Sequence, residues 1–336
     1  MNQLSDRLNS LSPSATLAMS QKSAELKAQG VDVINLSVGE PDFNTPDHIK
    51  EAAKKAIDDN FSRYSPVPGY PALRNAIVEK LKKENGLDYT VAQISCANGA
   101  KQSVCNAILV LVNPGDEVIV PAPYWVSYPE MVKLAEGKPV IVTAGIEQDF
   151  KITPAQKKAA NTPKTKALIL CSPSNPTGSE YSKEELAGLV AVLAKHPQVI
   201  VIADEIYEHI NYIGKHQSIA QFPEMKDRTV IVNGVSKAYA MTGWRLGYAC
   251  APETILKQML KIHLFAIMCA PTTSQYAAVE AMKNGDEDVA QMREEYNGRR
   301  RYVLHRFKEM GLKCFEPFGA FYAFPSIKEF GMTSDE

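Results

Sequence analysis

The sequence predicts an α/β protein in which a mainly parallel β-sheet lies between two layers of helices. Short apolar runs rich in β-branched residues recur along the chain, and amphipathic segments separate several of them. Because the runs are apolar on both faces, they suit strands that helices cover on each side. We expect strands at 31–38, 93–99, 116–123, 138–144, 166–173, 198–205, 229–236 and 245–252.

Two segments between these runs carry apolar residues at helical spacing, at 101–113 and 182–196. Ser182 stands just before the acidic start of the second segment, as helix N-caps often do. From Pro271 the chain becomes charged and helical, and the simplest interpretation is one long helix that leaves the sheet. The run 314–325 that follows resembles the first strands of a second domain.

The length of 336 residues exceeds what one hydrophobic core usually organises. We therefore expect an N-terminal arm and part of a small domain at 1–45, a large domain at 46–295, and the start of the C-terminal part of the small domain at 296–336. The small α/β domain, formed by both termini, would be incomplete in this sequence.

The composition excludes several classes of partner. With 45% hydrophobic residues, 22% charged residues and a net charge of −1, the chain lacks the basic footprint of a nucleic-acid-binding protein. No apolar run approaches the roughly 18 residues of a membrane span, and no secretory leader is recognisable, so we expect a cytoplasmic protein. The six cysteines are widely spaced without a CxxC pattern, which favours reduced thiols over a metal site.

Polar and glycine-rich residues follow the carboxyl ends of several expected strands. In open α/β sheets this edge binds ligands, so we expect these residues to share one pocket. They include Asn98 to Lys101, Pro123 to Trp125, Pro173 to Gly178, Asp204 to Tyr207, and Ser236 with Lys237.

Lys237 is the most informative of these residues. A lysine is usually a solvated surface charge, but an apolar strand precedes Lys237 and an apolar loop with glycine and tryptophan follows it. Burial there would lower the pKa of the amine and free it for Schiff-base chemistry. Arg245, eight residues later, would add a permanent positive charge.

The segment SKAYAMTGWRLGY at 236–248 resembles the lysine and phosphate-binding signature of class I (fold-type I) aminotransferases, which use pyridoxal 5′-phosphate. From about Leu11 onwards the chain resembles the bacterial aspartate aminotransferase branch of that family. The resemblance implies that 46–295 is the cofactor-binding domain and that Lys237 holds the cofactor. It also implies a homodimer, in which Tyr64 reaches the phosphate in the neighbouring subunit's site.

Around the cofactor ring, the resemblance assigns Asp204 as the counterion of the protonated ring nitrogen, which makes the ring an electron sink. Tyr207 and Asn175 resemble the donors to the phenolic oxygen, and Asn175 also belongs to the substrate site. Trp125 resembles the aromatic residue that stacks on the ring and touches substrate. Gly39 resembles the glycine whose backbone meets the substrate carboxylate.

At the phosphate end, we expect Gly99, Ala100 and Lys101 to open a helix whose amides and dipole favour an anion. Arg245 would bind the phosphate as a bidentate donor, and Ser236 would add a hydroxyl. Neither GxGxxG nor a Walker motif is present, which disfavours a nicotinamide-dependent oxidoreductase. No metal ligand set is expected.

The expected reaction is transfer of the amino group of an L-amino acid, aspartate by resemblance, to 2-oxoglutarate in a ping-pong cycle. Lys237 would move the proton, assisted by Asp204 and Tyr207. The family's C-terminal arginine, which binds the substrate carboxylate, has no equivalent before Glu336, so we expect a fragment of a longer product. The alternatives are a β-eliminating lyase or another aminotransferase on the same fold, and a protein that binds the cofactor without turnover.

Overall fold

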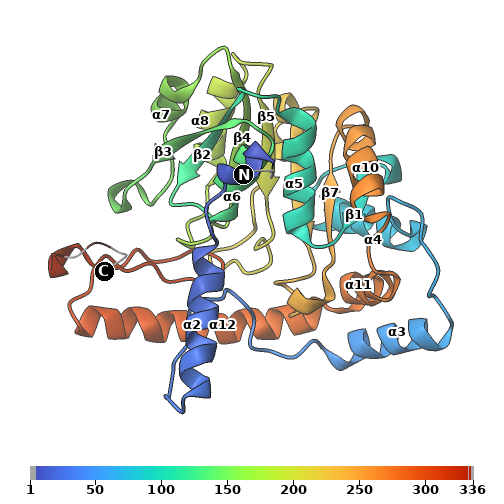
Figure 1. Cartoon of the computed structure of the whole chain (residues 1–336), viewed down its shortest axis with the longest axis horizontal. Helices are drawn as coiled ribbons and strands as arrows, with labels where there is room; N and C mark the ends of the chain where they lie inside the picture. The colour runs from blue at the N-terminus through green and yellow to red at the C-terminus, as the bar shows by residue number, and fades with distance from the viewer. Residues whose placement is uncertain (1–4, 332, 334–336) are drawn as a thin grey trace.

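The computed structural model describes residues 5–331 and 333 (Figure 1). Its strands are β1 (Ile94–Ala97), β2 (Glu117–Ala122), β3 (Lys138–Thr143), β4 (Thr165–Cys171), β5 (Ile200–Asp204), β6 (Thr229–Gly234) and β7 (Gly247–Cys250). Its α-helices are α1 (Asp6–Asn9), α2 (Ala15–Ala28), α3 (Asp47–Asp58), α4 (Pro71–Lys80), α5 (Ala100–Leu111), α6 (Ser127–Leu134), α7 (Pro154–Ala160), α8 (Lys183–Leu193), α9 (Pro223–Lys226), α10 (Glu253–Ile267), α11 (Thr272–Asn284) and α12 (Asp286–Glu309).

The seven strands form one sheet in the order β1-β7-β6-β5-β4-β2-β3. The pairs β2 with β3, β2 with β4, β4 with β5, and β5 with β6 are parallel. Strand β7 runs antiparallel to both of its neighbours, β6 and β1. The predicted mainly parallel sheet is therefore confirmed.

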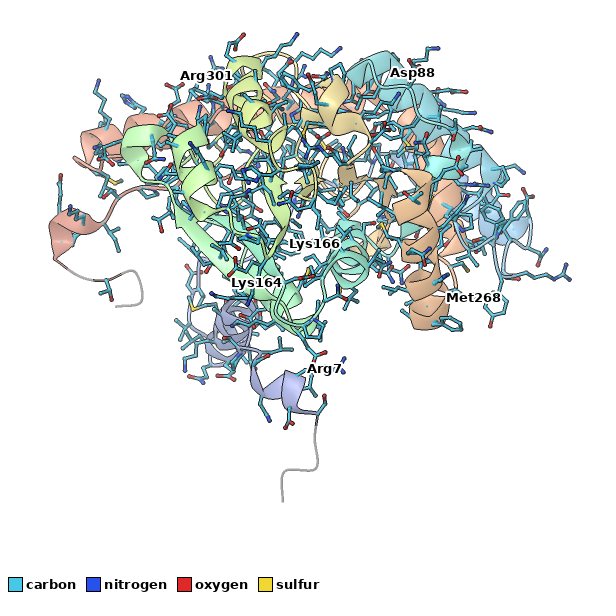
Figure 2. All side chains as sticks on the ribbon, turned by 90° about the horizontal axis from the view of Figure 1, so that it is seen from above. Arg7, Asp88, Lys164, Lys166, Met268 and Arg301 are labelled. Carbon is cyan, nitrogen blue, oxygen red and sulfur yellow. The ribbon has the colours of Figure 1, made fainter. Side chains whose placement is uncertain are left out.

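Side chains alternate between two buried faces along the central strands. On β4, Ala167 and Ile169 pack with residues of α5, α6 and α10, whereas Leu168 and Leu170 pack with residues of α8. Helices α3, α4 and α11 form a further core with β1 and β7. Helices thus cover both faces, which explains why the strands lack a polar side. Figure 2 shows the molecule from above, with charged side chains such as Asp88 and Arg301 on its outside.

The predicted start of α8 is confirmed, whereas the single long helix predicted after Pro271 is not. Ser182 caps α8: its side chain accepts a hydrogen bond from the backbone N–H of Glu185, whose own side chain accepts one from the Ser182 backbone. The long helix expected after Pro271 is wrong as a single element, because it is divided at Gly285 into α11 and α12. A Cβ at Gly285 would lie 2.6 Å from the carbonyl oxygen of Ala281 and 2.7 Å from the ring of Tyr239, so this close packing requires glycine.

Two expected strand regions are also wrong. No strand within the described part of the chain pairs with the segment 31–38, and its apolar side chains Ile34 and Leu36 are 85% and 90% exposed. Alternating apolar residues form a strand only where a neighbouring strand can pair with them, and the sheet edges are β1 and β3. The run 314–325 contains only isolated bridges, Cys314 with Pro325 and Asn211 with Gly319.

The boundaries at residues 45 and 295 stay a prediction, and α12 passes through residue 295 without a break. Within the described residues, no helix is both long and apolar enough to cross a bilayer. The parallel strands β4, β5 and β6 end near Cys171, Asp204 and Gly234, and the predicted site residues follow these ends.

Candidate active site

A cavity of about 380 Å³ lies at the carboxyl ends of the central strands. Ten residues predicted for the site line it: Gly39, Ala100, Lys101, Trp125, Asn175, Asp204, Tyr207, Ser236, Lys237 and Arg245. The predicted convergence of distant segments is therefore correct. Of the charged residues that line it, three are cations and one, Asp204, is an anion, so the cavity suits anionic ligands.

Lys237 lies three residues beyond the end of β6 at Gly234. Its amine donates a hydrogen bond to the backbone carbonyl of Gly39 at 2.6 Å. Nζ lies 5.8 Å from the ring centre of Tyr207 and 5.6 Å from that of Phe321. Burial lowers the pKa of Lys237 to about 8, although Glu40 acts in the opposite direction. An amine with this pKa can lose its proton near neutral pH, as Schiff-base formation requires.

Asp204 is the last residue of β5 and is 4% exposed. One carboxylate oxygen accepts a hydrogen bond from the Tyr128 hydroxyl at 2.8 Å, and the other accepts one from the backbone N–H of Ile206 at 3.3 Å. Burial raises the pKa of Asp204 to about 6, against the effect of the Tyr128 hydrogen bond. A cation bound next to this carboxylate would stabilise its ionised form.

Asn175 and Tyr207 meet at Tyr322. The Asn175 amide donates to the Tyr322 hydroxyl at 3.1 Å, and the hydroxyls of Tyr207 and Tyr322 are 2.5 Å apart. Burial raises the pKa of Tyr207 well above its ordinary value and that of Tyr322 to about 12, so both hydroxyls keep their protons. All three residues line the cavity, so their amide and hydroxyl groups are within reach of a bound ligand.

The N-terminus of α5 forms the cationic end of the cavity. Gly99 precedes the helix with φ +80°, and a Cβ there would lie 2.3 Å from Nη2 of Arg245. The Arg245 guanidinium donates to the carbonyls of Thr242 and Asn98 at 2.7 and 3.2 Å. Among the residues that the structure describes, neither Arg245 nor Lys101 has a carboxylate partner. Helix amides and two cations without a counterion are what a phosphate group requires.

Trp125 lies at the edge of this cationic end. Nζ of Lys101 is 4.8 Å from the centre of a Trp125 ring, and the Tyr128 ring meets Trp125 edge-on at 5.3 Å. Burial lowers the pKa of Lys101, and Arg245 lowers it further. At Gly39, a Cβ would lie 2.1 Å from the Tyr322 hydroxyl, so this position requires glycine for space.

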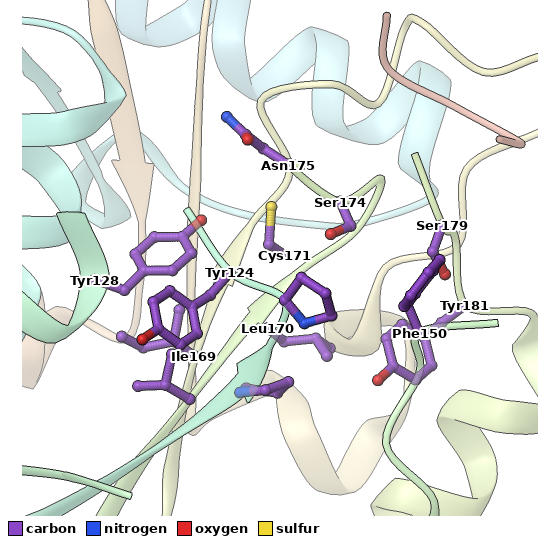
Figure 3. A pocket seen from close by; sticks show the side chains of 13 residues that line it. Tyr124, Tyr128, Phe150, Ile169, Leu170, Cys171, Ser174, Asn175, Ser179 and Tyr181 are labelled. Atoms are coloured by element: carbon purple, nitrogen blue, oxygen red, sulfur yellow. The ribbon is translucent and has the colours of Figure 1, made fainter. Parts of the chain in front are cut away.

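A second, much smaller cavity of about 20 Å³ adjoins the first (Figure 3). It shares Tyr128, Cys171 and Asn175 with the large cavity, and it continues past Tyr124 to Phe150 and Tyr181. Its volume is close to that of a single water molecule, so it has no room for a cofactor.

Several lining residues were not predicted: Thr16, Val38, Tyr128, Cys171, Thr242 and Tyr322. Two of these residues could have been predicted from the sequence. Tyr322 belongs to the aromatic run at 318–324, and Thr242 belongs to the segment around Lys237. Ile206 also lines the cavity and belongs to the segment 204–207 that was expected to reach it. Gly99 does not line the cavity, but it directly precedes Ala100, which does, and a Cβ at Gly99 would meet Arg245. Tyr64 does not line the cavity of its own chain and is 80% exposed.

The residues present fit pyridoxal phosphate. Lys237 offers a shielded amine and Asp204 a buried carboxylate, while Lys101 and Arg245 offer positive charge at the N-terminus of α5. Asn175 and Tyr207 line the same cavity, where both meet the Tyr322 hydroxyl. An aldehyde, a pyridine nitrogen, a phosphate and a phenolic oxygen are the groups that such a set would bind.

Comparison with known proteins agrees with this fit. The family described as "Aminotransferase class I and II" matches residues 31–332. The aspartate/prephenate aminotransferase of Cereibacter sphaeroides is 50% identical over 96% of this chain and 82% of its own length. The aspartate aminotransferase of Geobacillus stearothermophilus is 49% identical over 97% of this chain and 84% of its own length. The solved structure of the Thermus thermophilus aspartate aminotransferase with maleate superposes with a TM-score of 0.94 at 42% identity, covering 98% of this chain and 86% of that one.

Proposed function

The chain belongs to the class I and II aminotransferases, a pyridoxal-phosphate-dependent family, and from this premise we propose that it transfers the amino group of L-aspartate to 2-oxoglutarate. The observation that supports this most is the shielded amine of Lys237 in one cavity with Asp204 and the two cations Lys101 and Arg245. The maleate of the Thermus thermophilus structure is a dicarboxylate, as aspartate is.

In this proposal, Lys237 holds the cofactor through its amine, and Asp204 pairs with the ring nitrogen. Asn175 and Tyr207 donate hydrogen bonds to the phenolic oxygen. The phosphate is bound by Lys101, Arg245, Ser236 and the backbone amides of Gly99 and Ala100. Trp125 stacks on the ring, and Gly39 and Asn175 contact substrate. When bound, the cofactor supplies the electron sink that lets the Cα proton of an amino acid leave.

Lys237 then serves as the acid and base of proton transfer, because its lowered pKa leaves it able to accept and return a proton near neutral pH. Tyr207 keeps its own proton and so acts as a donor rather than a base. The two half-reactions give ping-pong kinetics: one 2-oxo acid leaves before the second binds.

We also propose a homodimer in which Tyr64 completes the partner's phosphate site. Tyr64 is 80% exposed in a single chain, and Phe265 of α10 is 88% exposed. Exposed large apolar side chains of this kind often mark a protein interface. The small amino acid and 2-oxo acid substrates are the other expected partners.

The test is a visible spectrum of protein reconstituted with pyridoxal phosphate and titrated with a panel of amino acids. We expect aspartate and glutamate to discharge the visible band, and a 2-oxo acid to form without ammonia. Release of ammonia with pyruvate would instead support the β-eliminating alternative. A band that no amino acid changes would support a cofactor-binding protein without turnover, and an aromatic preference would move the substrate assignment away from aspartate.

A further inference from the structure

A second set of polar side chains lies buried behind the cavity, on the opposite side of the segment that follows β5. Asp204 and Tyr207 line the cavity, whereas their chain neighbours Glu205 and Glu208 do not. Glu205 and Glu208 are 3% and 6% exposed, and Lys80, the last residue of α4, is 4% exposed. Buried charges of this kind are kept only where they are paired.

Glu208 joins three elements of the fold. One of its oxygens accepts hydrogen bonds from the amine of Lys80 and from the amide of Asn233, and the other accepts one from the Asn85 amide at 2.8 Å. Lys80 also donates to the Asn85 side chain at 2.8 Å. Asn233 lies on β6, four residues before Lys237. Through one carboxylate, Lys80 is therefore linked to the segment of Tyr207 and to the strand that leads to Lys237.

Glu205 is held in a similar way. It accepts a hydrogen bond from the Ser218 hydroxyl at 2.6 Å, and its other oxygen lies 3.4 Å from His216. The second ring nitrogen of His216 lies 3.2 Å from Glu180. Burial alone would lower the pKa of His216, but Glu205 and Glu180 outweigh it and raise the pKa to about 10. His216 is therefore a buried cation at neutral pH.

The potential ligand atoms of Glu205, Glu208 and His216 lie close enough together to hold a metal ion. Lys80 and the charged His216 already supply the positive charge there. Burial opposes the charge on Lys80, yet Glu208 and Glu84 raise the pKa of Lys80 above its ordinary value. The cluster is thus an ion-pair network of Lys80 and His216 with the surrounding carboxylates.

We propose that Lys80 is a positioning residue for the candidate active site. By holding Glu208, Lys80 fixes Tyr207 on one side of the cavity, and through Asn233 it fixes the end of β6 that leads to Lys237. A separate surface cavity of about 300 Å³ reaches Glu208 and His216, so water can enter this region when the ion pair is removed. The inference rests on the proposed function, because Tyr207 is assigned there as a donor to the cofactor's phenolic oxygen.

The test uses the holoenzyme of a double variant, Lys80→Met with Glu208→Gln. Removing both charges avoids the unpaired buried ion that a single substitution would leave, so the protein should fold. Loss of the Tyr207 donor disfavours the ionised phenolate, so the pH midpoint of the bound cofactor's visible absorbance should rise, by about 0.5 to 1 unit. The variant leaves the charged groups that face Lys237, namely Glu40, Asp204 and Arg245, unsubstituted, so a shift of the midpoint reports the displacement of Tyr207.

Lys82→Met is the matched control, because Lys82 lies two residues away with a side chain that is 76% exposed. We expect this control to keep the wild-type midpoint. Lys80→Arg keeps the positive charge but changes the shape of the side chain, so we expect it to shift the midpoint upward. A folded double variant and a Lys80→Arg variant that both keep the wild-type midpoint would overturn the proposal and leave Lys80 a purely structural role. If the wild type itself gives no visible band with pyridoxal phosphate, the proposed function has failed instead.

Discussion

At the scale of the residue, burial shifts the pKa values of two charged groups of the site in opposite directions. Burial lowers the pKa of Lys237 to about 8 and raises that of Asp204 to about 6. Both shifts bring the groups toward neutral pH, where proton transfer is most efficient. An amine and a carboxylate with these shifts are typical of functional sites.

Replacing Lys237 with alanine should remove the visible band of the bound cofactor and lower kcat by at least roughly 10²- to 10⁴-fold, because no acid or base remains to move the Cα proton. The fold should survive, since Lys237 has no carboxylate within ion-pair distance among the described residues. Absorbance spectroscopy, steady-state kinetics and circular dichroism would check these three points. Lys158→Ala, at an exposed lysine of α7, should change none of them. A surviving visible band in Lys237→Ala would contradict the assignment.

Relative to the wild type, the cofactor-free Asp204→Asn variant should gain stability as the pH rises. The variant should also bind the cofactor more weakly. The pKa of Asp204 is about 6 in the folded protein, above its ordinary value of 3.8, so the folded state holds this proton more strongly than the unfolded state does. The wild type therefore loses stability as the pH rises from 3.8 to about 6. Asparagine carries no such cost. Urea unfolding at pH 5 and pH 8 should show a gain for the variant that grows with pH, up to on the order of 3 kcal/mol. A difference independent of pH would show that the wild-type carboxylate carries no burial cost.

At the scale of the element, the N-terminus of α5 depends on a glycine that gives the arginine room. Gly99→Ala would place a Cβ 2.3 Å from Arg245 Nη2 at a φ of +80°. We expect the displaced guanidinium to weaken pyridoxal-phosphate affinity by about 10- to 100-fold, which corresponds to the loss of about 1.4 to 2.8 kcal/mol from a charge-assisted hydrogen bond. Fluorescence titration would measure this.

Gly115→Ala is the control for Gly99→Ala. Gly115 has a similar φ of +84°, and no atom lies within 4 Å of the position of its missing Cβ. The control should therefore cost stability through backbone strain without changing affinity. Equal loss of affinity in both variants would mean that strain, rather than Arg245, sets the phosphate site.

The strands were predictable because their burial on both faces leaves continuous apolar runs, as at Ala167 to Leu170. The cavity residues were predictable where they follow strand ends, as Asp204 and Lys237 do. The segment 31–38 has the same alternation but no partner strand, and the local pattern cannot indicate pairing. Tyr128 and the network around Lys80 depend on tertiary contacts between distant segments, such as Tyr128 with Asp204, and no local spacing encodes them.

At the scale of the whole molecule, the proposed dimer would make each site depend on two chains. Mixing Tyr64→Ala with Lys237→Ala subunits should give more activity than either variant has alone, because a mixed dimer contains one site with both native residues. Steady-state assays after subunit exchange would measure this. If Tyr64 served its own chain's site, no mixed dimer would contain an intact site and the activity would not recover.

The most direct test of the role of Lys237 is to add pyridoxal phosphate, reduce the protein with borohydride, and locate the resulting adduct by peptide mass spectrometry. Only an amine bonded to the cofactor's aldehyde carbon is trapped in this way. The shielded position of Lys237 beside Gly39 and Tyr207 predicts a single adduct on the peptide that contains Lys237. An adduct on a different lysine, with Lys237 unmodified, would contradict the assignment on which the proposed function depends.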